Sequence, residues 1–399
     1  MRAIAALSVV LFHLSFFNAW ARPDHFTAPY VSRAEVGVTI FFLISGFLLY
    51  RPFALARRAD ASSPSLAGYA WRRVLRILPA YWVALTVIGL ALAADELFDS
   101  SLPVYYGLLQ IYSDEYALGF QGFGQAWSIA VEISFYVMLP LFAMVMRAVP
   151  ARSERSWFAT ELAGLGCLFV VGVGYKLLVL GPDVLGTAVL RAGSSELMLL
   201  PNFLDQFAIG MALGVIALRY ERRPRLPAAL RAVERRPGVC WLVAAVAFWA
   251  VSTQIGLRGG FESPTETQVL ARHALFTLVA AALLLPAVFG SPERGLLRRL
   301  LGTRTLQWLG LISYGIFLWH LGWLFQLDAW GFDPAGGNFV VRDLAWPLVA
   351  VGGAIGLGAL SWYLVERPAL SFKGLFPRST PPPTQEAAAE VNAPARRVS

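Results

Sequence analysis

The stretch EVGVTIFFLISGFLLYRPFALA, residues 35–56, decides the fold of this chain. A helix that crosses the hydrocarbon core of a bilayer needs about 20 mostly apolar residues, and this stretch supplies them. Further segments along the chain meet the same criterion. The sequence therefore predicts an all-α, polytopic membrane bundle of about ten transmembrane helices, at residues 3–20, 35–56, 77–95, 127–146, 157–179, 200–218, 239–256, 270–290, 306–327 and 344–364.

The composition of the whole chain leads to the same class of protein. The 399 residues are 57% hydrophobic and 15% charged, with a mean hydropathy of +0.59. Soluble domains carry about 25% charged residues, so the composition excludes a soluble globular protein and a disordered chain. The two cysteines, Cys167 and Cys240, lie inside apolar runs. They exclude a disulfide framework, and the four dispersed histidines predict no metal site.

The net charge of +8 reflects arginines that cluster between the apolar runs. These arginines are not interleaved with stacking aromatics on one surface, so nucleic acid is not an expected partner. If the N-terminus is cytoplasmic, the inner loops carry 25 of the 33 basic residues and the outer loops carry five. The positive-inside rule then places both termini in the cytoplasm and predicts a multi-pass protein of the inner (plasma) membrane.

Arg2 and His13 form the first candidate site. They are separated by 11 residues, which places both side chains on one face of a helix, about 16 Å apart along its axis. An ionisable group inside a membrane span raises the free energy of insertion, so such a residue is a candidate for a functional role. A long anionic donor suits the pair, because Arg2 holds phosphate while His13 meets a reactive carbonyl. The alternative is that His13 is a packing histidine bonded to a neighbouring helix.

A second polar stripe lies on the span that starts at Trp127. Ser128, Glu132 and Tyr136 follow one another at four-residue intervals on an otherwise apolar helix. A carboxylate bonded to an imidazole fixes the tautomer of the ring and raises its basicity, so we expect Glu132 to contact His13. The alternative is that Glu132 belongs to a buried ion pair.

Two further pairs complete the candidate residues. Ser313 and His320 lie seven residues apart on one face of the ninth span, where His320 is either part of the site or part of an interfacial aromatic belt. Arg73 and Arg76 lie three residues apart at the cytoplasmic mouth. They suit bidentate phosphate contacts, although such clusters also act as topology signals. In the segment FFLISGF, Ser45 and its glycine neighbour let helix backbones approach closely.

Taken in this order, the segments resemble the acyltransferase-3 family of membrane acyltransferases. The resemblance implies transfer of an acyl group, usually acetyl from acetyl-CoA, to a hydroxyl on an extracytoplasmic carbohydrate, glycolipid or macrolide-like glycoside. It is carried by Arg2 with His13, FFLISGF at 41–47, RVLRILP at 73–79, Trp127-Ser128 with Glu132, SYGIFLWH at 313–320 and Glu366-Arg367-Pro368.

The resemblance also assigns roles. It makes His13 the catalytic residue and makes Arg2, Arg73 and Arg76 the donor-binding cations. Glu132 is the second catalytic candidate and, with Ser128, shapes the acceptor side. Acyl-CoA is then a co-substrate, and no bound cofactor is expected. The acceptor-side or supporting residues are Ser45, Trp127, Ser128, Ser313 and His320.

Three questions stay open at this level. His13 acts either as a general base on the acceptor hydroxyl or as a nucleophile through a covalent acyl-histidine. The same buried His and Glu also suit a proton-coupled transporter or flippase of a glycan or lipid, and a membrane scaffold is the third class. Ala19-Trp20-Ala21 resembles a signal-peptide cleavage site, but the single positive charge before it and the long apolar run argue against cleavage.

The expected domain organisation is simple. Residues 1–372 form an acyltransferase-3-like transmembrane domain, and residues 373–399 form a disordered cytoplasmic tail rich in Pro, Ala and Glu. We expect no fused extracellular SGNH-type domain, because the chain ends within 35 residues of the last predicted span. Transfer is then completed within the membrane portion or with a separate partner.

Overall fold

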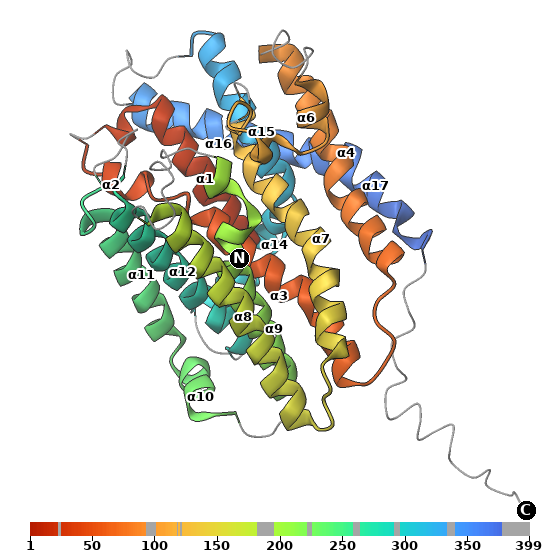
Figure 1. Cartoon of the computed structure of the whole chain (residues 1–399). Coiled ribbons are helices and arrows are strands. Elements are labelled where there is room, and N and C mark those ends of the chain that lie inside the picture. The colour runs from red at the N-terminus through yellow and green to blue at the C-terminus, as the bar shows by residue number, and fades with distance from the viewer. Residues whose placement is uncertain are drawn as a thin grey trace, which may run out of the picture.

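The structure is a computed structural model. It describes residues 1–22, 25–92, 101–117, 119, 122–181, 195–221, 226–257, 264–290, 296–332 and 340–376. These residues form helices and turns and contain no β-strand, which confirms the all-α prediction. Figure 1 shows the long helices side by side in one bundle. Most of the predicted disordered tail lies outside the described residues. Structure continues past residue 372, however, because the ring of Phe376 lies 5.8 Å from that of Trp71.

Every predicted span coincides with a helix. The long helices are α1 (Arg2–Phe17), α3 (Val36–Arg58), α4 (Leu66–Leu92), α7 (Trp127–Ala148), α8 (Glu154–Leu180), α9 (Leu204–Tyr220), α11 (Pro237–Thr253), α12 (Glu266–Phe289), α15 (Ser313–Ala329) and α16 (Trp346–Ser361). The shorter ones are α2 (Ala28–Val31), α6 (Leu102–Tyr106), α10 (Ala228–Arg235), α13 (Leu296–Leu301), α14 (Arg304–Leu311) and α17 (Arg367–Ser371). Helix α4 begins at Leu66 rather than at residue 77, so Arg73 and Arg76 lie on a helix and not in a loop.

Fewer helices meet the criterion for a candidate membrane span than the ten predicted, so the predicted number is not confirmed. Among the described residues, seven helices are long and apolar enough to cross a bilayer, or up to nine if the bent pairs α10–α11 and α14–α15 each count as one span. Helix α1 has 16 residues, so it is about 24 Å long at 1.5 Å per residue, less than the ~30 Å hydrocarbon core. Figure 1 accordingly places the N-terminus about midway along the bundle.

Helices α3 and α9 are the most closely packed pair of helices in the described bundle. A Cβ atom built on Gly46 of α3 would collide with the carbonyl oxygen of Phe207, and one built on Gly210 of α9 would collide with that of Leu43. Only glycine allows the two backbones to come this close. The expectation that FFLISGF is a helix-packing segment is therefore confirmed.

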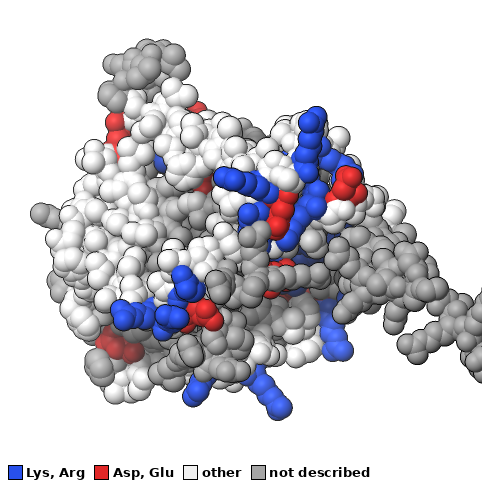
Figure 2. All heavy atoms as spheres, turned by 90° about the horizontal axis from the view of Figure 1, so that it is seen from below, with Lys and Arg blue, Asp and Glu red and all other residues white. Residues whose placement is uncertain are grey.

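The outside of the bundle is apolar, and one end carries many charged side chains. Only 17% of the most apolar window of α8 is buried, and valines and leucines such as Val170 and Leu178 face outward, as a lipid-facing helix requires. Figure 2 shows Lys and Arg side chains over the end of the bundle that carries α10 in Figure 1. Arg57 forms a buried ion pair with Glu161 there. The fold is thus that of a multi-pass membrane protein with one basic end.

Candidate active site

Four neighbouring cavities run through the bundle beside α1. We call them the basic cavity (about 390 Å³), the neck (about 30 Å³), the amide cavity (about 320 Å³) and the aromatic cavity (about 450 Å³). The neck shares Arg2 and Glu132 with the basic cavity, and Phe42 and Phe317 with the amide cavity. His13 lines both the amide and the aromatic cavity. Helix α1 therefore brings Arg2 to one part of this series and His13 to another.

Cationic side chains dominate the basic cavity. Its charged lining residues are Arg2, Arg72, Arg73, Arg76, Glu132 and Lys373. The guanidinium of Arg73 lies over the rings of Tyr69 and Tyr136, at 6.0 and 5.7 Å from their centroids, which holds it at the cavity wall. Five basic groups against one carboxylate make this cavity suited to an anionic ligand such as a phosphate.

The three predicted donor cations differ in their partners. Arg76 donates to Glu366 at 2.9 Å, and this carboxylate is 1% exposed. Arg2 and Arg73 have no ion-pair partner within the described parts of the chain, and the Nε atom of each is buried without a hydrogen-bond acceptor. Arg2 and Arg73 are thus available to an external anion, while Arg76 is engaged by the protein itself.

Glu132 has different partners from those predicted. Its Oε1 atom accepts hydrogen bonds from Ser45 and from Tyr136, each at 2.6 Å. It lines the basic cavity and the neck together with Arg2. The expected contact between Glu132 and His13 is therefore wrong. It assumed that the two helices adjoin at the same level, whereas α1 packs against α3 and α15 instead of α7.

His320 is the residue that contacts His13. Nδ1 of His320 lies 2.7 Å from the carbonyl oxygen of Phe317, which only accepts, so we assign the proton of His320 to Nδ1. Its Nε2 then has a free electron pair and lies 3.1 Å from Nδ1 of His13. Nδ1 of His13 also faces the carbonyl oxygen of Val9 at 3.0 Å and therefore carries the proton. This network leaves Nε2 of His13 as an unprotonated nitrogen.

The remaining supporting residues lie at different places in the bundle, and only some of them line one of the four cavities. His320 is fully buried against His13 of α1 rather than part of an interfacial belt. Ser313 follows the bend between α14 and α15 and donates to the carbonyl oxygen of Gly310, and it lines none of the four cavities. Ser128 lies in the neck, and Ser45 lies in the basic cavity beside Glu132. Neither serine is on the His13 side of the neck.

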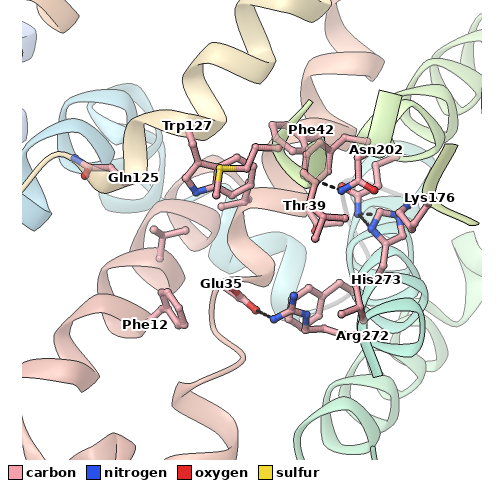
Figure 3. Close-up of a pocket in the computed structure, with 18 of the residues that line it drawn as sticks. Phe12, Glu35, Thr39, Phe42, Gln125, Trp127, Lys176, Asn202, Arg272 and His273 are labelled. Atoms are coloured by element: carbon pink, nitrogen blue, oxygen red, sulfur yellow. Dashed lines mark hydrogen bonds and ion pairs between the residues drawn. The ribbon is translucent and has the colours of Figure 1, made fainter. Parts of the chain in front are cut away.

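The amide cavity contains a polar cluster that sequence reasoning missed. His273 lies 2.6 Å from both Lys176 and Asp205, and the Lys176–Asp205 distance is 3.5 Å. Figure 3 shows Lys176 and His273 together at one side of the cavity, with Arg272 paired to Glu35 on the wall. Lys176 and Arg272 are charged residues within predicted spans, and this signal could have identified the cluster.

The expected acceptor-side residue Trp127 lies on the same side of the neck as His13. Both residues line the amide and aromatic cavities.

The described residues contain no group of three or more His, Cys, Asp or Glu residues that could hold a metal ion.

Fold and site together define a polytopic helical membrane protein in which a narrow neck lies between a cavity rich in basic residues and a polar cavity, lined by His13, whose charged residues are paired. A family model described as an acyltransferase domain matches residues 1–366. The chain belongs to the acyltransferase-3 family, as its motifs predicted.

Three relatives illustrate the similarity. YrhL of Bacillus subtilis, provisionally named as a peptidoglycan O-acetyltransferase, is 28% identical over 341 residues, covering 80% of this chain and 47% of the relative. The peptidoglycan O-acetyltransferase OatA of Listeria monocytogenes is 23% identical, covering 80% and 48%. Nodulation protein 10 of Rhizobium leguminosarum is 27% identical, covering 89% and 86%. The chain thus spans about half the length of the first two. No solved structure gives a significant match.

Proposed function

We propose that this protein is a membrane O-acyltransferase that transfers an acyl group, in the first place acetyl, from cytoplasmic acyl-CoA to a hydroxyl of an extracytoplasmic carbohydrate or glycolipid. One observation carries the proposal. His13, with Nε2 unprotonated, lies beyond a narrow neck from a cavity lined by five basic residues. Such an arrangement places a base next to the reactive end of a long anionic donor.

The donor side follows from the charge of the basic cavity. Arg2 and Arg73 bind the phosphates of acyl-CoA, because neither has a carboxylate partner among the described residues. Arg2 and His13 are 11 residues apart on α1, which is about 16 Å along a helix axis. The neck, at about 30 Å³, cannot hold a nucleotide, so in this proposal the nucleotide stays in the basic cavity and the thioester arm extends through the neck towards His13. The basic end of the bundle then faces the cytoplasm, and the protein lies in the plasma membrane.

The chemistry uses the free nitrogen of His13. Nε2 takes the proton of the acceptor hydroxyl while the oxygen attacks the thioester carbonyl carbon. The carbon–sulfur bond breaks, and the imidazolium returns the proton to the CoA thiolate. General-base assistance of this kind contributes about 10²–10⁴ in rate. His320 acts as a positioning residue, because together with the Val9 carbonyl it holds the Nδ1 proton of His13, and it lines none of the four cavities.

The relatives indicate which acceptors to try first. YrhL and OatA are named for peptidoglycan, so saccharides of the cell wall are the first candidates. Membranes that contain the wild-type chain should release free CoA from acetyl-CoA only when an acceptor fraction from the cell envelope is added. The same membranes with His13→Ala should lose this release by about 10²–10⁴. Retained turnover in His13→Ala would exclude His13 as the base.

The transporter or flippase alternative makes a different prediction. A transporter moves a glycan or lipid across the membrane without consuming thioester. Wild-type proteoliposomes that translocate substrate but release no CoA would therefore replace the acyltransfer proposal with this alternative. CoA release that does not require the acceptor but does require His13 would indicate a covalent acyl-histidine instead of general-base catalysis.

A further inference from the structure

Three side-chain amides line the amide cavity, and in each of them the amide nitrogen is hydrogen-bonded within the protein. Gln125 donates its amide NH2 to the carbonyl oxygen of Leu318 at 2.8 Å, and Asn202 donates to that of Leu197 at 2.6 Å. A carbonyl oxygen only accepts, so these contacts fix which way each amide points. Nε2 of Gln206 lies 3.3 Å from the hydroxyl of Thr277, which donates its own proton to the carbonyl oxygen of His273 and therefore accepts here; the same Nε2 also lies 3.3 and 3.4 Å from the ring nitrogens of His273.

The amide oxygens are therefore the groups without partners. Oε1 of Gln125, Oδ1 of Asn202 and Oε1 of Gln206 are buried and accept no hydrogen bond from any residue that the structure describes. The three residues are 3%, 7% and 2% exposed, and all line the amide cavity. Buried acceptors without donors are costly. All three belong to residues that line one cavity, so a ligand with several hydroxyl or N–H donors would satisfy them if it turned these side chains inward.

The charges of the amide cavity cancel, in contrast to those of the basic cavity. Lys176 lies 3.5 Å from Asp205, and Arg272 lies 3.1 Å from Glu35. Each cation in the wall thus has its own carboxylate, and none is left for an anionic ligand. A carboxylate or phosphate entering here would have to be desolvated without a compensating charge.

The cavity also offers an apolar surface next to these oxygens. Trp127 lines it, and Figure 3 shows this ring between Asn202 and Gln125. An aromatic ring beside hydrogen-bond acceptors suits a ligand that has both C–H and O–H groups, as a sugar ring does. The volume of about 320 Å³ is near the lower end of the range for small-molecule sites, about 300–1,000 Å³.

We infer that Gln125, Asn202 and Gln206 form a specificity subsite that binds an uncharged, hydroxyl-rich sugar unit of the acceptor and excludes anionic sugars. The inference rests on the proposed function for the role of the sugar as acceptor, although the binding itself does not require acyl transfer. The ion pair of Lys176 with Asp205 holds His273 beside Gln206 and keeps the subsite neutral.

Binding to the full chain in lipid nanodiscs tests this inference without any donor. The probes are the methyl glycosides of glucose, N-acetylglucosamine, galactose and mannose, each compared with the corresponding uronate, and binding is measured by saturation-transfer NMR and titration. We expect at least one neutral glycoside to bind with at least tenfold lower Kd than its uronate. Absence of binding by all neutral probes, or equal binding of a neutral glycoside and its uronate, would overturn the inference.

Two variants locate the binding. Asn202→Leu and Gln206→Met each remove one acceptor oxygen and should raise the Kd of the neutral glycoside about 3- to 10-fold, as expected for one lost hydrogen bond. Gln110→Met is the matched control. Gln110 is also a buried amide that donates to a backbone carbonyl and has an unpartnered Oε1, but it lines none of the four cavities. The Gln110→Met variant should bind the neutral glycoside with the Kd of the wild type. An equal rise in Kd for all three variants would contradict the subsite.

The same variants separate this inference from the proposed function. If Asn202→Leu and Gln206→Met weaken glycoside binding but the wild type never releases CoA, the subsite stands and the acyltransfer proposal fails. If acceptor-dependent CoA release occurs and both variants leave the acceptor KM unchanged, the subsite fails and the acyltransfer proposal stands. The KM for acetyl-CoA should not change in either variant, because both residues lie away from the basic cavity.

Discussion

Nε2 of His320 lies 3.1 Å from Nδ1 of His13, so two histidines from helices α1 and α15, 307 positions apart in sequence, form one hydrogen-bonded pair. The backbone carbonyls of Val9 and Phe317 set the tautomers of both rings. The pair gives a simple structural account of how a mid-helix histidine presents an unprotonated nitrogen to the cavities beside it.

His320 should affect turnover rather than binding. His320→Phe removes one of the two acceptors of the His13 Nδ1 proton and the contact that orients the ring, so we expect kcat to fall about 10- to 100-fold with little change in either KM. His320→Gln should recover part of kcat, because its amide oxygen accepts the same proton. Steady-state kinetics of CoA release measure both. A merely structural role would predict that KM and stability change and that Gln brings no rescue.

Arg73 should act on the donor. It has no carboxylate partner in the described structure and lines the basic cavity, so Arg73→Gln should raise the KM for acetyl-CoA about 10- to 100-fold through loss of a charge-assisted contact. Arg147→Gln is the control. Arg147 is an exposed arginine of α7 outside the cavities, where it donates to the carbonyl oxygen of Ala61. An equal rise in KM for both variants would indicate a general charge effect.

Arg76 should act on stability. Arg76→Ala leaves the carboxylate of Glu366 buried and unpaired, which we expect to cost about 3–5 kcal/mol in the free energy of unfolding. The double variant Arg76→Met/Glu366→Met should recover most of this loss, because it removes both charges. Thermal unfolding in nanodiscs measures the effect. If Arg76→Ala retains wild-type stability, the ion pair seen at 2.9 Å is not maintained.

Glu132 should affect binding of the acyl donor and not the general-base step. Glu132→Gln keeps an oxygen that accepts from Ser45 and Tyr136 but removes the only carboxylate in the lining of the basic cavity. We expect the KM for acetyl-CoA to fall a few-fold, because like-charge repulsion of the phosphates is lost, while kcat stays within about tenfold of the wild type. A loss of kcat as large as that of His13→Ala would restore Glu132 to the catalytic step.

Gly210 should be irreplaceable in the helix contact. Gly210→Ala places a methyl group against the carbonyl oxygen of Leu43, and we expect it to lower the free energy of unfolding by about 1–3 kcal/mol. Gly166→Ala is the control, because a Cβ atom there meets nothing within 4 Å. It should leave stability unchanged or raise it by up to about 1 kcal/mol. Similar losses for both variants would show that the α3–α9 contact is looser than described.

The sequence by itself determined where the helices lie and which residues share a helix face. Apolar length identified every long helix of the described structure, because lipid accepts few other surfaces. The spacing of Arg2 and His13 was likewise sufficient to place both along one series of cavities, since it depends only on the pitch of one helix. The packing role of Gly46 followed from local sequence too.

Tertiary structure alone decided which helices meet and at what level. It paired His13 with His320 instead of Glu132, because α1 packs against α3 and α15. It also assembled Lys176, Asp205 and His273 from the three helices α8, α9 and α12. The physical reason is that helical periodicity fixes positions within one helix, whereas contacts between helices depend on packing of side chains far apart in sequence.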